Sequence, residues 1–339
     1  MFGISKVRDT TQARFAVGLL QPAAAGAWLK REEAIMGTAI NVELWADDRT
    51  KGEAAIDAVM AEMHRIDRCM SPHKPASELS RINRDAAFAP VLLSAEMARL
   101  LLRAKEFSAL SEGAFDITYA VVGQLYDYRQ GIRPSDAALS RARTLVGWRN
   151  LIIEPHPVDP NTSTVRFALR GMRIDLGGFA KGHAVDNATK ILRARGIHHA
   201  NVSAGGDSRV IGDRRGRPWS VAIRDPRRAG EVVAVLPLED VSISTSGDYE
   251  RYFDEAGERH HHLIDPATGR SPHGVHSVTI LAPDGLSSEA LSKIVFVQGT
   301  QRGLALVETL PDVDAVVVDA AGVMHASSGL LHGSAATPS

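Results

Sequence analysis

Residues 174–183 read IDLGGFAKGH. This stretch decides the fold, because an apolar, strand-like segment runs into a glycine pair and then into the start of a helix. Glycine lets the backbone approach a ligand closely, and the first turn of a helix offers free N–H groups to an anion. The pattern is not a Walker phosphate loop, since Gly182 follows Lys181 and no Ser or Thr comes next, and it is not the dinucleotide fingerprint G-x-G-x-x-G. Taken alone, it predicts either an anion-binding turn or an ordinary tight turn.

Hydrophobic periodicity surrounds this stretch with amphipathic helices and short strands. Ser94 is expected to cap a helix over residues 95–110, and Gly196 to end a helix over residues 184–195. Further helices are predicted over residues 53–69 and 288–298, the second followed by Gly299. Strands are predicted at residues 40–45, 151–153, 165–169, 172–176, 200–203, 221–223, 232–236, 241–244, 278–281, 314–318 and 322–325. Hairpin-like strand pairs with few β-α-β alternations favour an α+β fold.

Composition narrows the class of protein. The 339 residues carry a formal net charge of -1, which gives no electrostatic source for non-specific nucleic-acid binding. Cys69 is the only cysteine, so an internal disulfide and cysteine-based metal sites are excluded. No apolar run reaches the roughly 18 residues of a transmembrane helix. Residues 15–28 are compatible with a degraded export signal or with a plain tail. We expect a tail or leader over residues 1–32, one domain over residues 33–330 and a flexible end over residues 331–339.

Four other motifs each have a structural and a functional interpretation. They are GAFDIT at 113–118, AGGD at 204–207, STSGDY at 244–249 and HHHLIDPATG at 260–269. The first three are typical of caps and turns, but in STSGDY the small hydroxyl residues beside a glycine at a strand end can also form hydrogen bonds with phosphates. Adjacent histidines point to alternating faces of an extended chain, so they cannot share one metal ion. The functional interpretation of the fourth motif is therefore a single histidine that acts as a base or contacts a ligand.

The order of these motifs resembles the ApbE family of flavin transferases. The succession is MGT at 36–38, SELS at 77–80 with Asn83, GAFDIT, DLGG with AKG, AGGD, TSGDY, and HLIDP with TG, and it covers about Glu33 to Leu330. The resemblance implies an α+β fold of two lobes with FAD extended in the cleft between them. It also implies FAD:protein FMN transferase activity, in which Mg²⁺ assists attack by a Thr or Ser hydroxyl of a target redox protein on the flavin-side phosphorus. FMN is then attached to the target and AMP leaves.

The resemblance also assigns roles to residues. Met36 is expected to contact the isoalloxazine, and the backbone carbonyl of Gly178 to bind the metal. The other FAD contacts that it implies are Glu78, Leu79, Phe115 and Asp116 around adenine and ribose, Lys181 and Gly206 at the central part, and His262 and Ile264 at the phosphates or flavin. His262 is the expected acceptor of the hydroxyl proton.

Positions 289 and 293 depart from the family pattern. Relatives carry Asp and, four residues later, Thr near Mg²⁺, whereas this chain has Glu289 and Lys293. A protonated lysine cannot bind a metal ion, and Glu followed four residues later by Lys is the favourable order for an ion pair on a helix. We expect either an altered metal site completed by Asp284 or a fixed Lys293 charge in the place of the cation.

Two alternatives to transfer follow from the same resemblance. One is an FAD-binding protein with an altered metal site and little or no transferase activity, and the other is an FAD pyrophosphatase, in which water attacks instead of a hydroxyl. The resemblance also implies the periplasmic face of a bacterial membrane, whereas a cytoplasmic location follows if residues 1–32 are not a signal.

Overall fold

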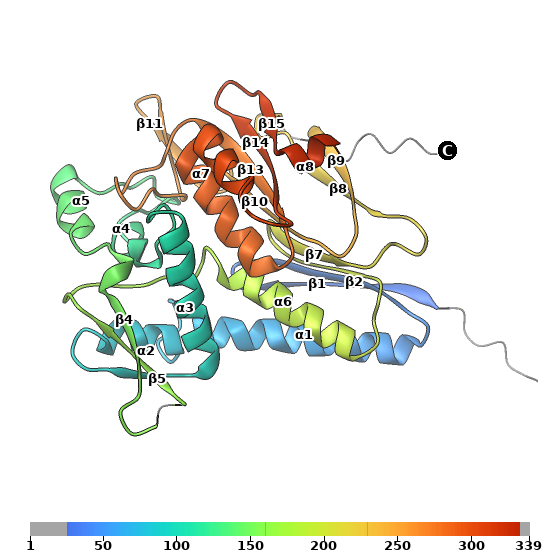
Figure 1. Cartoon of the computed structure of the whole chain (residues 1–339), viewed down its shortest axis with the longest axis horizontal. Coiled ribbons are helices and arrows are strands. Elements are labelled where there is room, and N and C mark those ends of the chain that lie inside the picture. Colours follow the sequence, from blue (N-terminus) through green and yellow to red (C-terminus); the bar gives the residue numbers. More distant parts are fainter. Residues whose placement is uncertain (1–25, 160, 229, 333–339) are drawn as a thin grey trace, which may run out of the picture.

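Two lobes make up the computed structural model, which describes residues 26–332 except 160 and 229 (Figure 1). Within these residues the larger lobe is built on an eight-stranded sheet in the order β1-β2-β6-β7-β10-β13-β14-β15, in which every pair of neighbours is antiparallel. Its strands are β1 (Ala27–Ile35), β2 (Thr38–Ala46), β6 (Ala200–Ala204), β7 (Asp207–Ile211), β10 (Ser242–Gly247), β13 (Val275–Ala282), β14 (Asp314–Asp319) and β15 (Met324–Ala326). An antiparallel sheet built largely from hairpins confirms the predicted α+β class.

A helical layer covers this sheet, and it consists of α1 (Arg49–Met70), α6 (Ala180–Ala194) and α7 (Gly285–Val307). α1 contacts β1 and β2, α6 contacts β6 and β7, and α7 contacts β10 and β13, with α6 between the other two helices (Figure 1). The buried face of α1 carries Ile56, Val59, Met63 and Ile66 at helical spacing. The glycine-rich stretch therefore enters the middle of this layer at the start of α6.

The smaller lobe lies between α1 and α6 in the sequence. It contains α2 (Glu78–Asp85), α3 (Ala95–Leu110), α4 (Ala120–Gly123), α5 (Asp136–Arg143) and a sheet of β3 (Val91–Leu93), β5 (Ser163–Phe167) and β4 (Leu151–Pro155). The larger lobe adds the hairpins β8 (Trp219–Arg224)–β9 (Val232–Leu238) and β11 (Tyr252–Glu255)–β12 (Glu258–His261), and the helix α8 (Ser328–His332). None of the helices in the described part of the chain is long and apolar enough to cross a bilayer.

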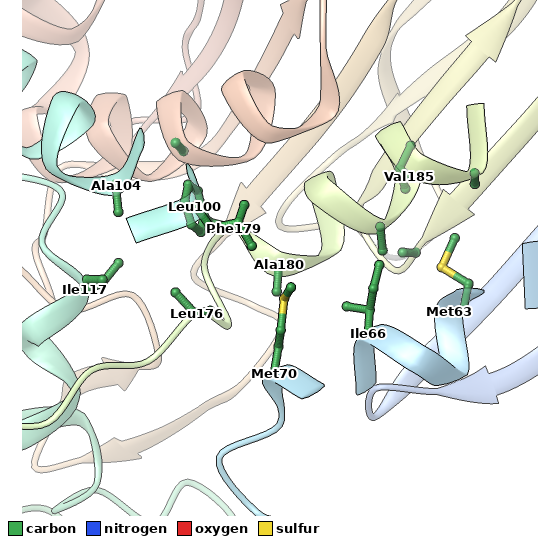
Figure 2. Packing of buried hydrophobic residues seen from close by; sticks show 14 of the residues in the cluster. Met63, Ile66, Met70, Leu100, Ala104, Ile117, Leu176, Phe179, Ala180 and Val185 are labelled. Atoms are coloured by element: carbon green, nitrogen blue, oxygen red, sulfur yellow. The ribbon is translucent and has the colours of Figure 1, made fainter. Parts of the chain in front are cut away.

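An apolar cluster runs through both lobes. It joins residues of α1 and α6 to residues of α3 and of the loop that follows α3, as Figure 2 shows for Met63, Leu100 and Ile117. The ring of Phe179, just before α6, lies 5.8 Å from the ring of Phe115 in the smaller lobe. The lobes therefore share one packed interior and are fixed relative to each other.

Helices α6 and α7 cross at two glycines. A Cβ atom added to Gly182 would lie 2.1 Å from the carbonyl oxygen of Gly285, and one added to Gly285 would lie 2.6 Å from the carbonyl oxygen of Gly182. Asp186 fixes the same crossing, since its carboxylate accepts the N–H groups of Gly285 at 2.7 Å and Leu286 at 3.0 Å. The start of α7 is thus held against the first turn of α6.

Replacing Gly182 by Ala is expected to lower the free energy of unfolding by about 1–3 kcal/mol, because the added methyl group overpacks a backbone–backbone contact. Urea unfolding measures this change. Gly178→Ala is the matched control, since its Cβ atom would meet no neighbour closer than 3.9 Å. Equal stabilities for the two variants would contradict the prediction.

Several predicted elements are confirmed. Helix α3 has the predicted bounds, and the Ser94 hydroxyl accepts from Met97 N at 3.1 Å as the expected cap. The hairpin β14–β15 is present. α7 leaves helical geometry at Gly299, where φ is 80°, but the helix resumes afterwards and continues to Val307. α6 begins four residues before the predicted start at Ala184.

Two local predictions are wrong. Residues 172–176 form no strand, because the amide of Asn83 takes the place of a strand partner: it donates to Ile174 O at 2.9 Å and accepts from Ile174 N at 2.8 Å. Conversely, β1 extends through residues 27–32, which were assigned to a tail, and pairs with β2 along its whole length. The predicted leader otherwise lies outside the described residues, as do residues 333–339 of the predicted flexible end.

Candidate active site

A cavity of about 480 Å³ lies between the lobes. The smaller lobe contributes residues 114–119 and the loop at 175–178, and the larger lobe contributes the β1–β2 and β6–β7 turns, the end of β10, the loop at 262–266 and α7. Segments that are far apart in the sequence therefore meet at one place, with a volume suited to an organic ligand. The predicted residues that line the cavity are Met36, Phe115, Asp116, Gly178, Lys181, Gly206, His262, Ile264 and Lys293.

Tight turns bring the backbone to the cavity. Met36 and Gly37 form the two-residue connection of the β1–β2 hairpin, with φ of 54° and 71°. Such a turn favours Asn or Gly, so a methionine in this conformation costs about 1–3 kcal/mol. The side chain that is held at this cost lines the cavity, which favours a ligand contact. In the β6–β7 turn, a Cβ atom on Gly206 would lie 2.8 Å from Thr245 O, so only glycine allows this approach.

Lys181, Asp207, Glu289 and Lys293 form a charge cluster at one wall of the cavity. The Lys181 ammonium binds the Asp207 carboxylate and lies 2.6 Å from Glu289 Oε1, and Lys293 Nζ lies 3.4 Å from the same oxygen. The N–H of Gly182 donates to Glu289 Oε2 at 2.7 Å. Glu289 is 0% exposed and does not line the cavity, whereas the other three side chains do. The ammonium groups therefore separate Glu289 from the cavity.

In this charge cluster, burial and ion pairing shift the pKa values of the side chains in opposite directions. Burial disfavours the charge of Lys181, yet Asp207 and Glu289 hold its pKa above the ordinary value. Burial also disfavours the Asp207 carboxylate, but Lys181 and Lys293 bring its pKa below the ordinary value. For Lys293 burial prevails over the attraction of Glu289 and Asp207, so its pKa lies below the ordinary lysine value. A buried row of hydroxyls continues the network, since Ser244 Oγ donates to Asp207 at 2.5 Å and lies 3.1 Å from Ser292 Oγ.

His262 lines the cavity as a neutral imidazole. Burial, reinforced by the positive charge of Arg251, lowers the pKa of His262 to about 3. No group among the described residues forms a hydrogen bond with its buried Nδ1. A buried nitrogen without a partner inside a cavity is suited to bind or deprotonate a ligand group.

Acid is expected to destabilise the protein through His262 and its neighbour His261. Burial lowers the pKa of His261 to about 4, so both imidazoles are neutral when folded and protonate near 6.5 when unfolded. The unfolded state then binds more protons, and stability is lost as the pH falls from 6.5 towards the folded pKa values. At pH 5 each histidine should cost up to about 2 kcal/mol, which urea unfolding at pH 7.5 and 5 measures. The loss should be smaller in His262→Gln, and an unchanged wild-type stability would contradict the prediction.

Two predicted FAD contacts lie elsewhere. Leu79 is fully buried in the apolar cluster, and Glu78 accepts from Ser94 N at 2.7 Å and Ser94 Oγ at 2.8 Å, outside the cavity. Glu78 thus ties the start of α2 to the start of α3. Asp116 lines the cavity, but its oxygens also accept from the N–H groups of Thr118 and Trp148, both at 2.8 Å.

In the described part of the chain, five charged residues that line the cavity were not among the predicted site residues: Asp175, Asp207, Arg224, Glu250 and Arg251. Asp175 accepts from Gly177 N at 2.5 Å, and burial raises its pKa. Asp175 belongs to the glycine-rich stretch at residues 174–183, so its position in that motif could have identified it as a cavity residue. Arg224 and Arg251 also line the cavity, and neither makes an ion pair with any other described residue. The sequence around these two arginines did not indicate a site, since arginine at an exposed strand end is common.

Comparison with known proteins identifies the family. Residues 36–317 match the ApbE family. The chain belongs to the ApbE family. It is 32% identical over 315 residues to the FAD:protein FMN transferase of Treponema pallidum, with 89% of this chain and 87% of the relative covered. The FAD:protein FMN transferase of Haemophilus influenzae is 32% identical over 285 residues, with coverage of 80% and 81%. The crystal structure of the ApbE protein of Thermotoga maritima superposes with a TM-score of 0.81 at 30% identity, with coverage of 90% and 99%.

The residues of this ApbE-family chain do not fit Mg²⁺. That ion needs near-octahedral oxygen ligands at about 2.0–2.1 Å. Glu289 already shares its oxygens among Lys181, Gly182 and Lys293, and a lysine ammonium offers no lone pair. No three His, Cys, Asp or Glu side chains in the described part of the chain are grouped to hold a metal ion.

The predicted rescue by Asp284 is wrong. The carboxylate of Asp284 caps α7 and accepts from Ser287 N at 2.7 Å and from Ser287 Oγ at 2.8 Å. It does not line the cavity. The predicted Glu289–Lys293 pair is present, but Lys181 is the nearer partner of Glu289.

Proposed function

We propose that this chain is an FAD:protein FMN transferase, which moves FMN from FAD onto a Thr or Ser hydroxyl of a target protein. The observation that carries the proposal is the cavity between the lobes, where fixed cations face a neutral histidine that lacks a partner. A diphosphate needs cations and a hydroxyl nucleophile needs a base, and both occur on the walls of one space. The names of the relatives support the same activity.

The free arginines are suited to the diphosphate. Arg224 and Arg251 line the cavity without a carboxylate partner in the described part of the chain, so their guanidinium groups are available to phosphate oxygens. Lys181, whose ammonium group is held by Asp207 and Glu289, provides a further fixed charge. Asp175 and Asp116 line the cavity from the smaller lobe, and we expect their carboxylates to accept hydrogen bonds from ribose or adenine.

The transfer step balances with His262 as the base. The hydroxyl oxygen of the target forms a bond to the flavin-side phosphorus, while the bond from that phosphorus to the bridging oxygen breaks. The bridging oxygen leaves as part of AMP, and the hydroxyl proton passes to His262. A pKa of about 3 leaves His262 unprotonated at neutral pH, with a free lone pair in the cavity. Met36, Phe115 and Ile264 supply apolar wall for the ring systems.

A second candidate function, FAD binding with little or no transfer, is favoured by a separate observation. Glu289 and Lys293 form an ion pair where relatives of this family are expected to hold Mg²⁺, which favours an FAD-binding protein that transfers little or no FMN. The two activities are separated by incubating the protein with FAD and a purified flavin-free target redox protein with an accessible acceptor Thr. Flavin fluorescence that stays with the denatured target in a gel supports transfer. Retained FAD without attachment supports the binding protein, and release of FMN and AMP without a target supports FAD pyrophosphatase activity.

The proposal also covers the acceptor of FMN and the cellular compartment of this protein. We infer an acceptor that carries its Thr or Ser on a redox protein, and a location at the periplasmic face of a bacterial membrane. Both rest on the family resemblance of the residues between 36 and 317. Detection of the protein in periplasmic rather than cytoplasmic fractions of the source cells tests the location.

A further inference from the structure

Lys293 lies where two predicted metal ligands approach each other. Its Cε atom is 3.9 Å from the position of a Cβ atom on Gly178, and its Nζ atom is 3.4 Å from Glu289 Oε1. One side chain thus reaches from the loop that carries Gly178 to the carboxylate of Glu289. The Lys293 side chain therefore lies near both of the residues that the resemblance assigns to the metal.

Glu289 is not available to an ion that enters the cavity. Its side chain is 0% exposed, and both oxygens accept from protein donors: Oε1 from the two lysines and Oε2 from Gly182 N at 2.7 Å. A metal ion would have to displace these donors; Lys181 would keep Asp207, but the Lys293 ammonium group would lose its only carboxylate partner among the described residues. Breaking one partner of a buried ion pair is strongly unfavourable.

The orientation of the charge cluster gives the cavity wall a positive face. Lys181 and Lys293 line the cavity, while Glu289 lies behind them. Asp207 turns its carboxylate to Lys181 and to Ser244. The cluster therefore balances its own charge within the protein, yet presents ammonium groups towards any anion in the cavity.

We propose that the ammonium group of Lys293 takes the place of the divalent cation, so that FAD binding and FMN transfer in this chain do not depend on Mg²⁺. The inference rests on the proposed FMN transfer. As the bond between the flavin-side phosphorus and the bridging oxygen breaks, negative charge grows on the AMP that leaves. The negative charge of a bound diphosphate favours the ammonium form of Lys293, and an ammonium group already held at this place stabilises the growing charge without being reorganised during the reaction.

The test measures FAD binding by isothermal titration in EDTA and in Mg²⁺, with no acceptor present. Wild-type affinity should agree within about twofold between the two conditions. Lys293→Thr should bind FAD about 10- to 100-fold more weakly in EDTA, since one charge-assisted contact is lost, and Mg²⁺ should restore much of that affinity. Lys293→Arg should remain independent of Mg²⁺. Lys190→Thr, an exposed position on α6, is the matched control and should behave as wild type.

The rate of covalent flavin attachment to a target then separates the two proposals. The wild-type rate should be unchanged in EDTA, and that of Lys293→Thr should fall about 10²–10³-fold and recover with Mg²⁺. Wild-type protein that binds FAD at least about tenfold more tightly with Mg²⁺, or transfers only with Mg²⁺, overturns the inference and leaves the proposed function standing. FAD binding without transfer in either condition overturns the proposed function, and no FAD binding in either condition overturns both.

Discussion

Replacing His262 by Gln is expected to slow FMN transfer by about 10²–10⁴-fold while FAD still binds. The imidazole lines the cavity, its buried Nδ1 has no hydrogen-bond partner among the described residues, and its pKa is about 3. A base that is already neutral needs no prior loss of a proton, so the wild-type rate should not fall through a histidine titration between pH 8 and 5. The measurement is the initial rate of covalent flavin attachment across this range.

His273→Gln is the matched control for this variant. His273 is exposed and pairs with Glu258 at 3.2 Å, away from the cavity. Its substitution should leave the rate unchanged. A His262→Gln rate within about fivefold of wild type would show that another group accepts the proton, since general bases usually contribute far more.

Replacing Lys181 by Met is expected to lower the free energy of unfolding by about 3–5 kcal/mol. The Lys181 ammonium binds both Asp207 and Glu289, whose side chains are 3% and 0% exposed. Without it, Lys293 is left as the nearby cation for two buried carboxylates, and its Nζ is 3.4 Å from Glu289. Urea unfolding at neutral pH measures the loss, and Lys190→Met on the exposed face of α6 controls for the change of residue type.

A double variant tests the cause of that loss. Adding Asp207→Asn to Lys181→Met removes one of the two carboxylates, so the second substitution should cost less than it does alone. Residues of one ion-pair network show such coupling, commonly about 0.5–3 kcal/mol. Additive effects, or a loss below about 1 kcal/mol for Lys181→Met, would mean that the charge cluster is not what stabilises this region.

Local signals in the sequence predicted most helices well and a polar strand poorly. Helix α3 is set by the Ser94 cap and by apolar spacing, both of which are local. β1 was missed because Lys30, Glu32 and other charged residues alternate along the edge strand of the sheet, which hides its buried side chains. Residues 172–176 look like a strand, but their partner is the side chain of Asn83, which is 91 residues away from Ile174.

The candidate site was predictable as a set of turns and less predictable in its charges. The β1–β2, β6–β7 and glycine-rich turns converge on the cavity because such residues allow the backbone to approach closely. Glu78 was assigned to the cavity but holds the start of α3, a contact that depends on how two helices pack. Lys181 was predicted to meet a ligand, yet its two carboxylate partners come from β7 and α7 and could not be read from its own motif.

The two lobes share one apolar core, so no separate interface lies between them about which one lobe could rotate as a rigid body. The cavity is therefore part of the packed fold, and we expect FAD to enter it without a large movement of one lobe relative to the other. We then expect the target protein to adapt instead, by presenting its Thr or Ser hydroxyl on a narrow, flexible segment that reaches into the cavity.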